Sequence, residues 1–365
     1  MQNAGLTDVS PNEHFAAWQG DDGVEKLVEV TRGSLVESEH WGSIAVADAA
    51  GNLLAWSGEP EGVTFYRSSA KPIQAIPVIT SGAAARFSLT EAELAIICAS
   101  HSGEETHVAV VGALLAKLGL SADALLCGVH PPFHKPSAQA IWQQGQKPGP
   151  LHCNCSGKHS GMLAICVHND WSLANYLDID HPLQQMLLRT MQDYHAYENI
   201  AVGVDGCGVP VYALPLSEMA KGYARLVDPD RLPAEVASAA HTLVHAMITH
   251  PSLVAGSERL DTILMEATGG RLVSKGGAEG VQCIGWQDKG IGIAIKIADG
   301  AARAIEPVAI EVLQQLGVLS EPELEVLATR HRVPIKNHRR DIVGELRPVF
   351  KLHGLGSRRE PVVDR

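Results

Sequence analysis

The sequence predicts an α+β fold in which strands from both ends of the chain form one antiparallel sheet, interrupted by a helical insertion. Strand-like apolar patterns gather near the two ends, and patterns with the 3.6-residue period of helices fill the middle. A chain of 365 residues also exceeds what one hydrophobic core usually serves. We therefore expect two lobes that share one cleft.

Strands are expected near both termini. The N-terminal ones cover residues 27–32, 42–48 and 53–57, with a turn at 49–52. The C-terminal ones cover residues 271–274, 281–286, 290–298 and 342–350, with a helix at 301–315 beside them. Residues 1–25 and 355–365 are polar, Gly-rich or charged, so we expect flexible ends there.

Five helices are expected between the two groups of strands, at residues 90–99, 105–118, 158–167, 182–194 and 234–249. Thr90 and Glu93 form a capping-box pattern at the start of the first. Residues 131–150 are dense in Pro, Gln and Gly and predict a surface loop. The sheet lobe then comprises about 26–80 and 255–354, and the helical lobe about 81–254.

Composition excludes several classes of function. A net charge of −12 and a pI near 5.8 argue against nucleic acid or an anionic membrane as a partner and favour a small-molecule substrate. No stretch approaches the roughly 18 apolar residues of a transmembrane helix, and residues 1–25 lack the pattern of a secretory signal. Seven cysteines, an odd number, suggest free thiols in a reducing compartment. We expect a cytoplasmic enzyme, ordinarily a homodimer.

Ser68-x-x-Lys71 can place a hydroxyl and an amine one helical turn apart, because residues 71–80 have apolar residues at near-helical spacing. A serine hydroxyl needs a base to become a nucleophile at neutral pH. Lysine can serve only when neutral, a state that burial or a neighbouring cation favours by lowering its pKa. The alternative is a helix-capping serine followed by a solvated lysine.

Two later motifs add to this pair. Ser100 supplies a second hydroxyl at the end of an apolar helix, and Lys275-Gly276-Gly277 supplies a late lysine before a strand. Serine β-lactamases and penicillin-binding proteins use the order Ser-x-x-Lys, middle serine, Lys-Thr-Gly. Here the middle serine comes early and glycine replaces threonine, and both departures argue against a true lactamase. Taken singly, Ser100 could equally be a helix cap and Lys275 a turn lysine.

Five sequence blocks in one order resemble the Rhizobium etli type of L-asparaginase over about residues 28–349. They are Arg67-Ser68-Ser69-Ala70-Lys71-Pro72, Cys98-Ala99-Ser100-His101-Ser102-Gly103-Glu104, Asn154-Cys155-Ser156-Gly157-Lys158-His159, Val204-Asp205-Gly206-Cys207-Gly208-Val209-Pro210 and Ser274-Lys275-Gly276-Gly277-Ala278-Glu279-Gly280. The resemblance implies hydrolysis of the asparagine side-chain amide to aspartate and ammonia, on a serine β-lactamase-like fold.

The chemistry we infer is acyl transfer through a serine ester. Ser68 would attack the amide carbon and Lys71 would take its proton. Ser100 and Lys275 would form a second hydroxyl–amine pair that relays a proton to the leaving ammonia. Two lysines close together would lower each other's pKa by like-charge repulsion. Backbone N–H groups at the helix start could bind the oxyanion.

Cys155 and Lys158 would share one helical face, and Cys207 lies on a glycine-rich turn after a predicted strand at 201–205. By themselves these cysteines read as ordinary core residues. The resemblance implies instead that Cys155, Lys158 and Cys207 hold Zn²⁺ near the serine site. A lysine ligand must be neutral, so metal affinity should fall at low pH.

Substrate contacts are expected from Asp205 to the α-amino group and from Arg67 and His159 to the α-carboxylate. Taken singly, each is equally consistent with a turn or surface residue. Cys153 stands where the family usually has an asparagine, which leaves direct substrate contact there open. Two alternatives to the asparaginase remain, namely a β-lactamase- or peptidase-like serine hydrolase and a non-enzymatic metal-binding protein.

Overall fold

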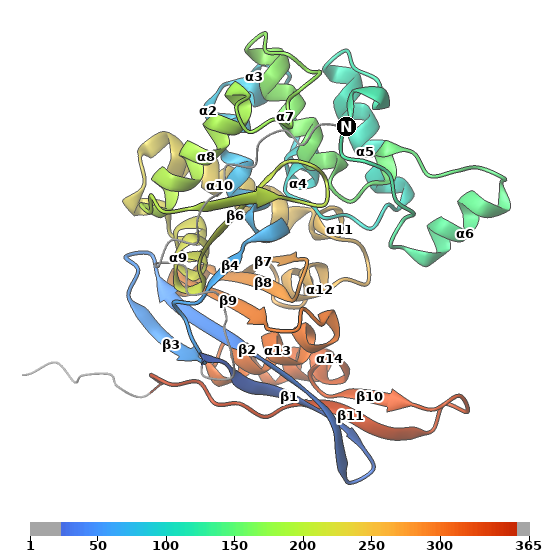
Figure 1. Ribbon diagram of the computed structural model, residues 1–365, viewed down its shortest axis with the longest axis vertical. Coiled ribbons are helices and arrows are strands. Elements are labelled where there is room, and N and C mark those ends of the chain that lie inside the picture. Colours follow the sequence, from blue (N-terminus) through green and yellow to red (C-terminus); the bar gives the residue numbers. More distant parts are fainter. Residues whose placement is uncertain (1–22, 356–365) are drawn as a thin grey trace, which may run out of the picture.

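The computed structural model describes residues 23–355 and contains an eight-stranded antiparallel sheet (Figure 1). The strand order is β10-β11-β1-β2-β9-β8-β7, and β3 pairs with β2 beside this path. The strands are β1 (Glu25–Arg32), β2 (Leu35–Asp48), β3 (Leu53–Ser57), β7 (Leu272–Gly277), β8 (Val281–Trp286), β9 (Ile291–Ile297), β10 (Val333–Lys336) and β11 (Ile342–Pro348). Because β2 pairs with β9, the two ends of the chain meet in the middle of the sheet, as predicted.

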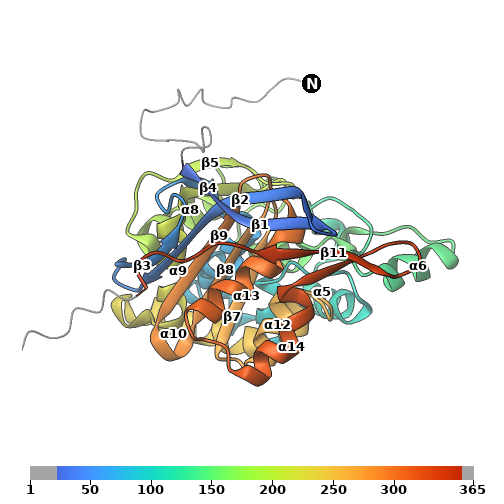
Figure 2. The ribbon, with the colours of Figure 1, turned by 90° about the horizontal axis from the view of Figure 1, so that it is seen from below.

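Both faces of this sheet are covered. Along β2, Ile44 and Val46 face one core while Ala45 and Ala47 face the other, as the two-residue period of a strand requires. The first core contains α12 (Leu260–Ala267), α13 (Ile305–Gln315) and α14 (Glu321–His331), and the second contains α9 (Leu216–Val227) (Figure 2). Gly292 lets α9 approach closely, since a Cβ there would lie 1.9 Å from the Ala220 carbonyl oxygen.

The remaining helices lie largely around a buried helix α7, except that α6 buries no residue and extends at the side of the molecule (Figure 1). They are α1 (Lys71–Gln74), α2 (Ile76–Thr80), α3 (Ala83–Arg86), α4 (Glu91–Ile97), α5 (Glu105–Lys117), α6 (Lys135–Gln143), α7 (Ser156–His168), α8 (Pro182–His195), α10 (Ala234–Thr249) and α11 (Pro251–Val254). A small second sheet has the order β4 (Val63–Phe65), β6 (Pro210–Pro215), β5 (Ala201–Val204).

Helices α4 and α7 pack with almost no space between them. A Cβ on Gly157 would lie 2.0 Å from the Ile96 carbonyl oxygen, and one on Gly161 would lie 2.7 Å from Ile97 Cγ2. This glycine seam brings the start of α7 against the end of α4. The segments that carry Cys155 and Ser100 are therefore held next to each other.

Most predicted elements are present, and the Thr90–Glu93 capping box is formed. Three expectations were wrong. The 131–150 loop contains helix α6, which starts with Pro136 in its first turn, a position that proline favours. The 71–80 helix is broken after Gln74, and the strand predicted at 42–48 starts at Leu35, where its outer half pairs with β1 as an exposed hairpin.

The predicted flexible ends, 1–25 and 355–365, lie almost entirely outside the described residues. The division into two lobes stays a prediction, although α9 packs on the sheet from within the segment assigned to the helical lobe. All seven cysteines are free and buried. No helix within residues 23–355 is both long and apolar enough to cross a membrane.

Candidate active site

Ser68 lies on a short 3₁₀ turn, Arg67–Ala70, that leads directly into α1. The Tyr66 N–H donates to the Tyr212 carbonyl oxygen at 2.8 Å, which anchors the turn to β6. Arg67 has φ +51°, a left-handed conformation that is costly for a non-glycine residue and common at functional sites. Ser68 is half-buried and lines a cavity of about 360 Å³ together with Ser100.

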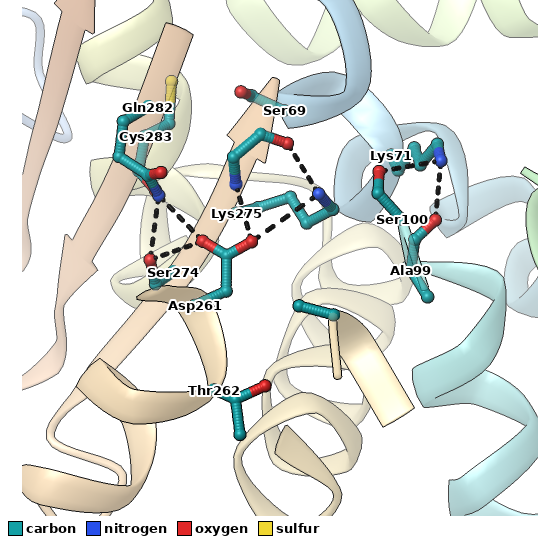
Figure 3. A network of polar contacts seen from close by, with 12 residues as sticks. Ser69, Lys71, Ala99, Ser100, Asp261, Thr262, Ser274, Lys275, Gln282 and Cys283 are labelled. Carbon is teal, nitrogen blue, oxygen red and sulfur yellow. Dashed lines mark hydrogen bonds and ion pairs between the residues drawn. The ribbon is translucent and has the colours of Figure 1, made fainter. Parts of the chain in front are cut away.

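Lys71 is buried and makes three hydrogen bonds, of which Figure 3 shows those to Ala99 and Ser100. Its Nζ donates to the Ala99 carbonyl oxygen at 2.6 Å, to Ser100 Oγ at 2.9 Å and to Cys155 Sγ at 3.3 Å. Ser100 is therefore paired with Lys71 and not with Lys275 as expected. The reason is geometric. Ser100 follows α4 and lies within hydrogen-bond distance of Lys71 on α1, whereas the amine of Lys275 on β7 contacts Gly276 and Asp261.

Lys275 is fully buried on β7, an edge strand of the sheet. Its Nζ donates to the Gly276 carbonyl oxygen at 2.6 Å and lies 3.8 Å from Asp261 Oδ2 (Figure 3). Burial lowers the pKa of Lys275 to about 7, with a further lowering from Lys71 and Arg259 against a raising by Asp261. Near neutral pH this amine is thus partly unprotonated.

Asp261 is a site residue that sequence reasoning missed. It is buried, and its carboxylate accepts hydrogen bonds from Ser274 Oγ, the Gly276 N–H and Gln282 Nε2, each at 2.9 Å (Figure 3). Burial raises its pKa, but the Lys275 ammonium and these donors outweigh burial and leave the pKa lowered. The available signal was a carboxylate one position into the apolar helix that precedes the Lys275 strand.

The three predicted metal ligands meet in the interior. Lys158 Nζ donates to Cys207 Sγ at 3.1 Å, and Cys155 lies between Cys207 and Lys71 in the same cluster. Thiol hydrogen bonds from Cys153 and Cys207, with the charges of Lys71 and Lys158, hold the pKa of Cys155 well below its usual range. Burial lowers the pKa of Lys158, but Cys207, Cys155 and Asp205 outweigh it and raise the pKa.

The chemistry of this donor set fits Zn²⁺, which binds sulfur and nitrogen ligands. The set contains two thiols and one amine, and the amine must lose its proton to bind. No group of three His, Cys, Asp or Glu side chains between residues 23 and 355 is arranged to hold a metal. Any site here therefore depends on Lys158 as a ligand.

The predicted substrate-binding residues divide into a pair and a single residue. Arg67 Nε donates to Asp205 Oδ1 at 2.9 Å, so these two already contact each other. His159 is fully buried, and its Nδ1 lies 2.7 Å from the Tyr176 hydroxyl, while its Nε2 has no partner. Burial lowers the pKa of His159 well below its ordinary value, so the ring is neutral.

Neither Arg67 nor Asp205 lines the 360 Å³ cavity. Its wall comes from the Ser68 turn, the end of β7 with the following loop, and the starts of α12 and α13. The lining residues are Ser68, Ser100, Phe133, Asn154, Arg259, Leu260, Asp261, Gly276, Gly277, Ala278, Glu279, Gly280, Val281, Gln282, Ala302, Ile305 and Glu306. Sequence analysis assigned a chemical role to only two of these residues, Ser68 and Ser100, although Asn154 and residues 276–280 lie within the quoted blocks.

Comparison with known proteins gives one family. The sequence profile of L-asparaginase II matches residues 28–348, which is most of the chain. No curated protein sequence matches significantly. Among solved structures, a β-lactamase from Mycobacterium bovis aligns at 14% identity over 75% of this chain and 94% of its own, with a TM-score of 0.39.

Two further solved structures align similarly. A putative β-lactamase from Bacteroides dorei has 12% identity, covers 75% of this chain and 93% of its own, and has a TM-score of 0.37. A protein described as Mglu, in its native form in concentrated NaCl, has 13% identity and a TM-score of 0.36. It covers 76% of this chain and 61% of its own.

Proposed function

Because the chain belongs to the L-asparaginase II family and is an amidohydrolase acting on L-asparagine, we propose that it works as the Rhizobium etli type does, through a Ser68 ester and with a nearby zinc site. One observation carries this proposal. Ser68 and Ser100 line the same cavity, and the buried amine of Lys71 is bonded to Ser100. These contacts support the assignment of Ser68 as nucleophile, Ser100 as relay hydroxyl and Lys71 as base.

In the first half-reaction Lys71 acts in its neutral form, which donates two hydrogen bonds and has one lone pair. Ser68 Oγ attacks the side-chain amide carbon, and Lys71 accepts the serine proton. Ser100, which accepts a hydrogen bond from Lys71 at 2.9 Å, passes its own proton to the amide nitrogen as the C–N bond breaks and ammonia leaves, and the proton that Lys71 took from Ser68 replaces it. Water then attacks the serine ester and gives aspartate and free Ser68. Backbone N–H groups at this helix start stabilise the oxyanion.

Lys275 is the second amine of the site. General acid–base groups work best with a pKa near the operating pH, and the Lys275 pKa of about 7 meets that condition. When Lys275 is unprotonated, the site that it shares with Lys71 carries one positive charge fewer. We assign Lys275 the role of a proton acceptor that helps Lys71 to be neutral when it takes the proton of Ser68.

For substrate recognition, Asp205 binds the α-amino group, and Arg67 and His159 bind the α-carboxylate. The Tyr176 hydroxyl accepts a hydrogen bond from the Leu126 N–H at 2.9 Å and can give its own proton to His159 Nδ1. Nε2 of His159 then carries the ring proton as an unpartnered buried donor, which suits an anion.

Cys155, Lys158 and Cys207 are the residues that would hold zinc. When bound, the metal would supply a positive charge close to the serine site. Lys71 donates to Cys155 Sγ, so the protein's own contact links this cluster to the catalytic amine. Zinc binding would keep Cys155 as a thiolate, which can accept that hydrogen bond.

The test is ammonia release from L-asparagine by the wild type, Ser68→Ala and the neighbouring control Ser69→Ala. Ser69 is buried, and within residues 23–355 its hydroxyl makes no hydrogen bond of ordinary geometry, so its loss should be mild. We expect Ser68→Ala to lose on the order of 10³-fold or more in kcat. L-glutamine and a chromogenic lactam are run in parallel. Retained turnover in Ser68→Ala would discard the nucleophile, and lactam cleavage without asparagine turnover would support the lactamase-like alternative.

A further inference from the structure

Arg259 is a cation in the cavity wall, and the proposed hydrolysis of asparagine gives it no role. It immediately precedes α12, and it lines the cavity together with Ser68 and Ser100. Its guanidinium carbon lies 6.0 Å from the centre of the Phe133 ring, another lining residue. In the described part of the chain, this guanidinium has neither a hydrogen bond nor an ion pair. It therefore has its five donors available to a ligand.

The carboxylates around Arg259 are occupied or exposed. Asp261 accepts three hydrogen bonds and faces Lys275, and Glu306 is ion-paired with Arg330 at 2.7 Å. Glu279 is exposed, with Lys296 as its electrostatic neighbour. Arg259 influences Asp261 and Glu306 through space but is bonded to neither. The cavity thus presents a positive group suited to an anionic part of a ligand.

The cavity is also too large for the departing group of asparagine. In the proposed function the aspartyl part lies against Arg67 and Asp205, which are outside the cavity wall. Only ammonia would then be left for about 360 Å³, a volume within the range of sites for whole small-molecule ligands. Leu260, Val281 and Ile305 add apolar surface there, which ammonia cannot use.

We propose that this cavity is a leaving-group subsite and that the enzyme also hydrolyses β-aspartyl amides of amino acids. The carboxylate of the departing amino acid would bind Arg259, and its side chain would lie on the apolar wall. This inference rests on the proposed function, because it uses the same Ser68 ester. It differs in the substrate class, which becomes an isopeptide instead of a primary amide.

The chemistry requires no further reactant. Ser68 Oγ loses its proton to Lys71 and forms an ester with the β-carbonyl carbon. The isopeptide C–N bond breaks, the amino-acid nitrogen takes the proton of Ser100, and Lys71 returns a proton to Ser100. Water then hydrolyses the ester. The net reaction is β-aspartylalanine plus water giving aspartate and alanine, and the second half-reaction is shared with asparagine.

The experiment measures kcat/KM of the wild type and Arg259→Ala on L-asparagine, β-aspartylalanine and β-aspartylalaninamide, in which an amide replaces the carboxylate. We expect alanine release by the wild type. Arg259→Ala should lower kcat/KM for β-aspartylalanine roughly tenfold to hundredfold, the usual effect of one charged contact. The amide should lose less than about threefold, and Arg259→Lys should recover part of the activity.

Arg339→Ala is the matched control, since Arg339 is 86% exposed at a distant hairpin. The inference is overturned if the wild type hydrolyses asparagine but neither isopeptide. It is equally overturned if Arg259→Ala lowers asparagine turnover as much as β-aspartylalanine turnover, because Arg259 would then hold the α-carboxylate of asparagine. Failure of the proposed function itself gives a different result, in which asparagine turnover is absent or survives Ser68→Ala.

Discussion

Lys275 and Lys158 are both buried, yet their surroundings drive their protonation in opposite directions. Around Lys275 on β7, burial prevails and the pKa falls to about 7. Around Lys158 on α7, the thiol groups of Cys207 and Cys155 prevail over burial and the pKa rises. The same side chain is thus a potential base in one region and a cation in the other.

The difference in pKa depends on how strongly the negative partner of each lysine stabilises the ammonium form. Asp261 is 3.8 Å from Lys275, not in hydrogen-bond contact, and accepts hydrogen bonds from three other donors. Its charge raises the pKa of Lys275 but does not outweigh burial. Cys207 Sγ is 3.1 Å from Lys158 and in direct hydrogen-bond contact. Burial alone therefore does not decide whether a lysine is neutral. The distance to its negative partner and the other hydrogen bonds of that partner also matter.

The largest effects are expected when each lysine is replaced. Lys275→Arg keeps a charge that cannot be lost, so we expect kcat for asparagine to fall by about 10²- to 10⁴-fold, the usual share of general acid–base catalysis. Lys158→Met should instead lower bound zinc, measured by elemental analysis of the purified protein. Equal zinc loss in both variants, or full activity in Lys275→Arg, would show that the two regions are not functionally distinct.

The pH dependence of kcat/KM tests the protonation state assigned to Lys275. Because the neutral amine is the active form, kcat/KM for asparagine should rise as pH increases through about 7. Asp261 raises the pKa of Lys275, so Asp261→Asn should move this limb to lower pH, by about one unit. Ser274→Ala, which removes a donor to the same carboxylate but leaves its charge, is the control. A limb that stays in place or moves upward in Asp261→Asn would contradict the assignment.

The smallest effect is expected where neither lysine is touched. Thr90→Ala removes the cap of α4, the helix that leads to Ser100, and should lower the free energy of unfolding by about 1 kcal/mol in denaturant titration. The pH limb should remain where it is in the wild type. A shifted limb would mean that the Lys275 pKa depends on overall stability more than on local partners.

The sheet and most helices could be predicted because apolar periodicity and capping patterns are local. Helix α6 was missed because Pro136 reads as a loop residue in sequence and as a helix-start residue in structure. The site residues came mostly from resemblance to a family. Their pairing did not, because whether Ser100 meets Lys71 or Lys275 depends on how α4 and β7 lie relative to α1. Arg259 and Asp261 belong to none of the quoted blocks, and their place in the site follows from the cavity wall and, for Asp261, from its hydrogen bonds.

The glycine seam between α4 and α7 has a consequence for engineering this enzyme. A methyl group at Gly157 would meet the Ile96 carbonyl oxygen and one at Gly161 would meet the Ile97 side chain, so a larger residue at either position must displace part of α4 close to Ser100. Another part of the cavity wall consists of side chains such as Phe133, Arg259 and Ile305, which can be exchanged individually. A library aimed at new amide substrates should therefore vary that wall and leave the seam untouched.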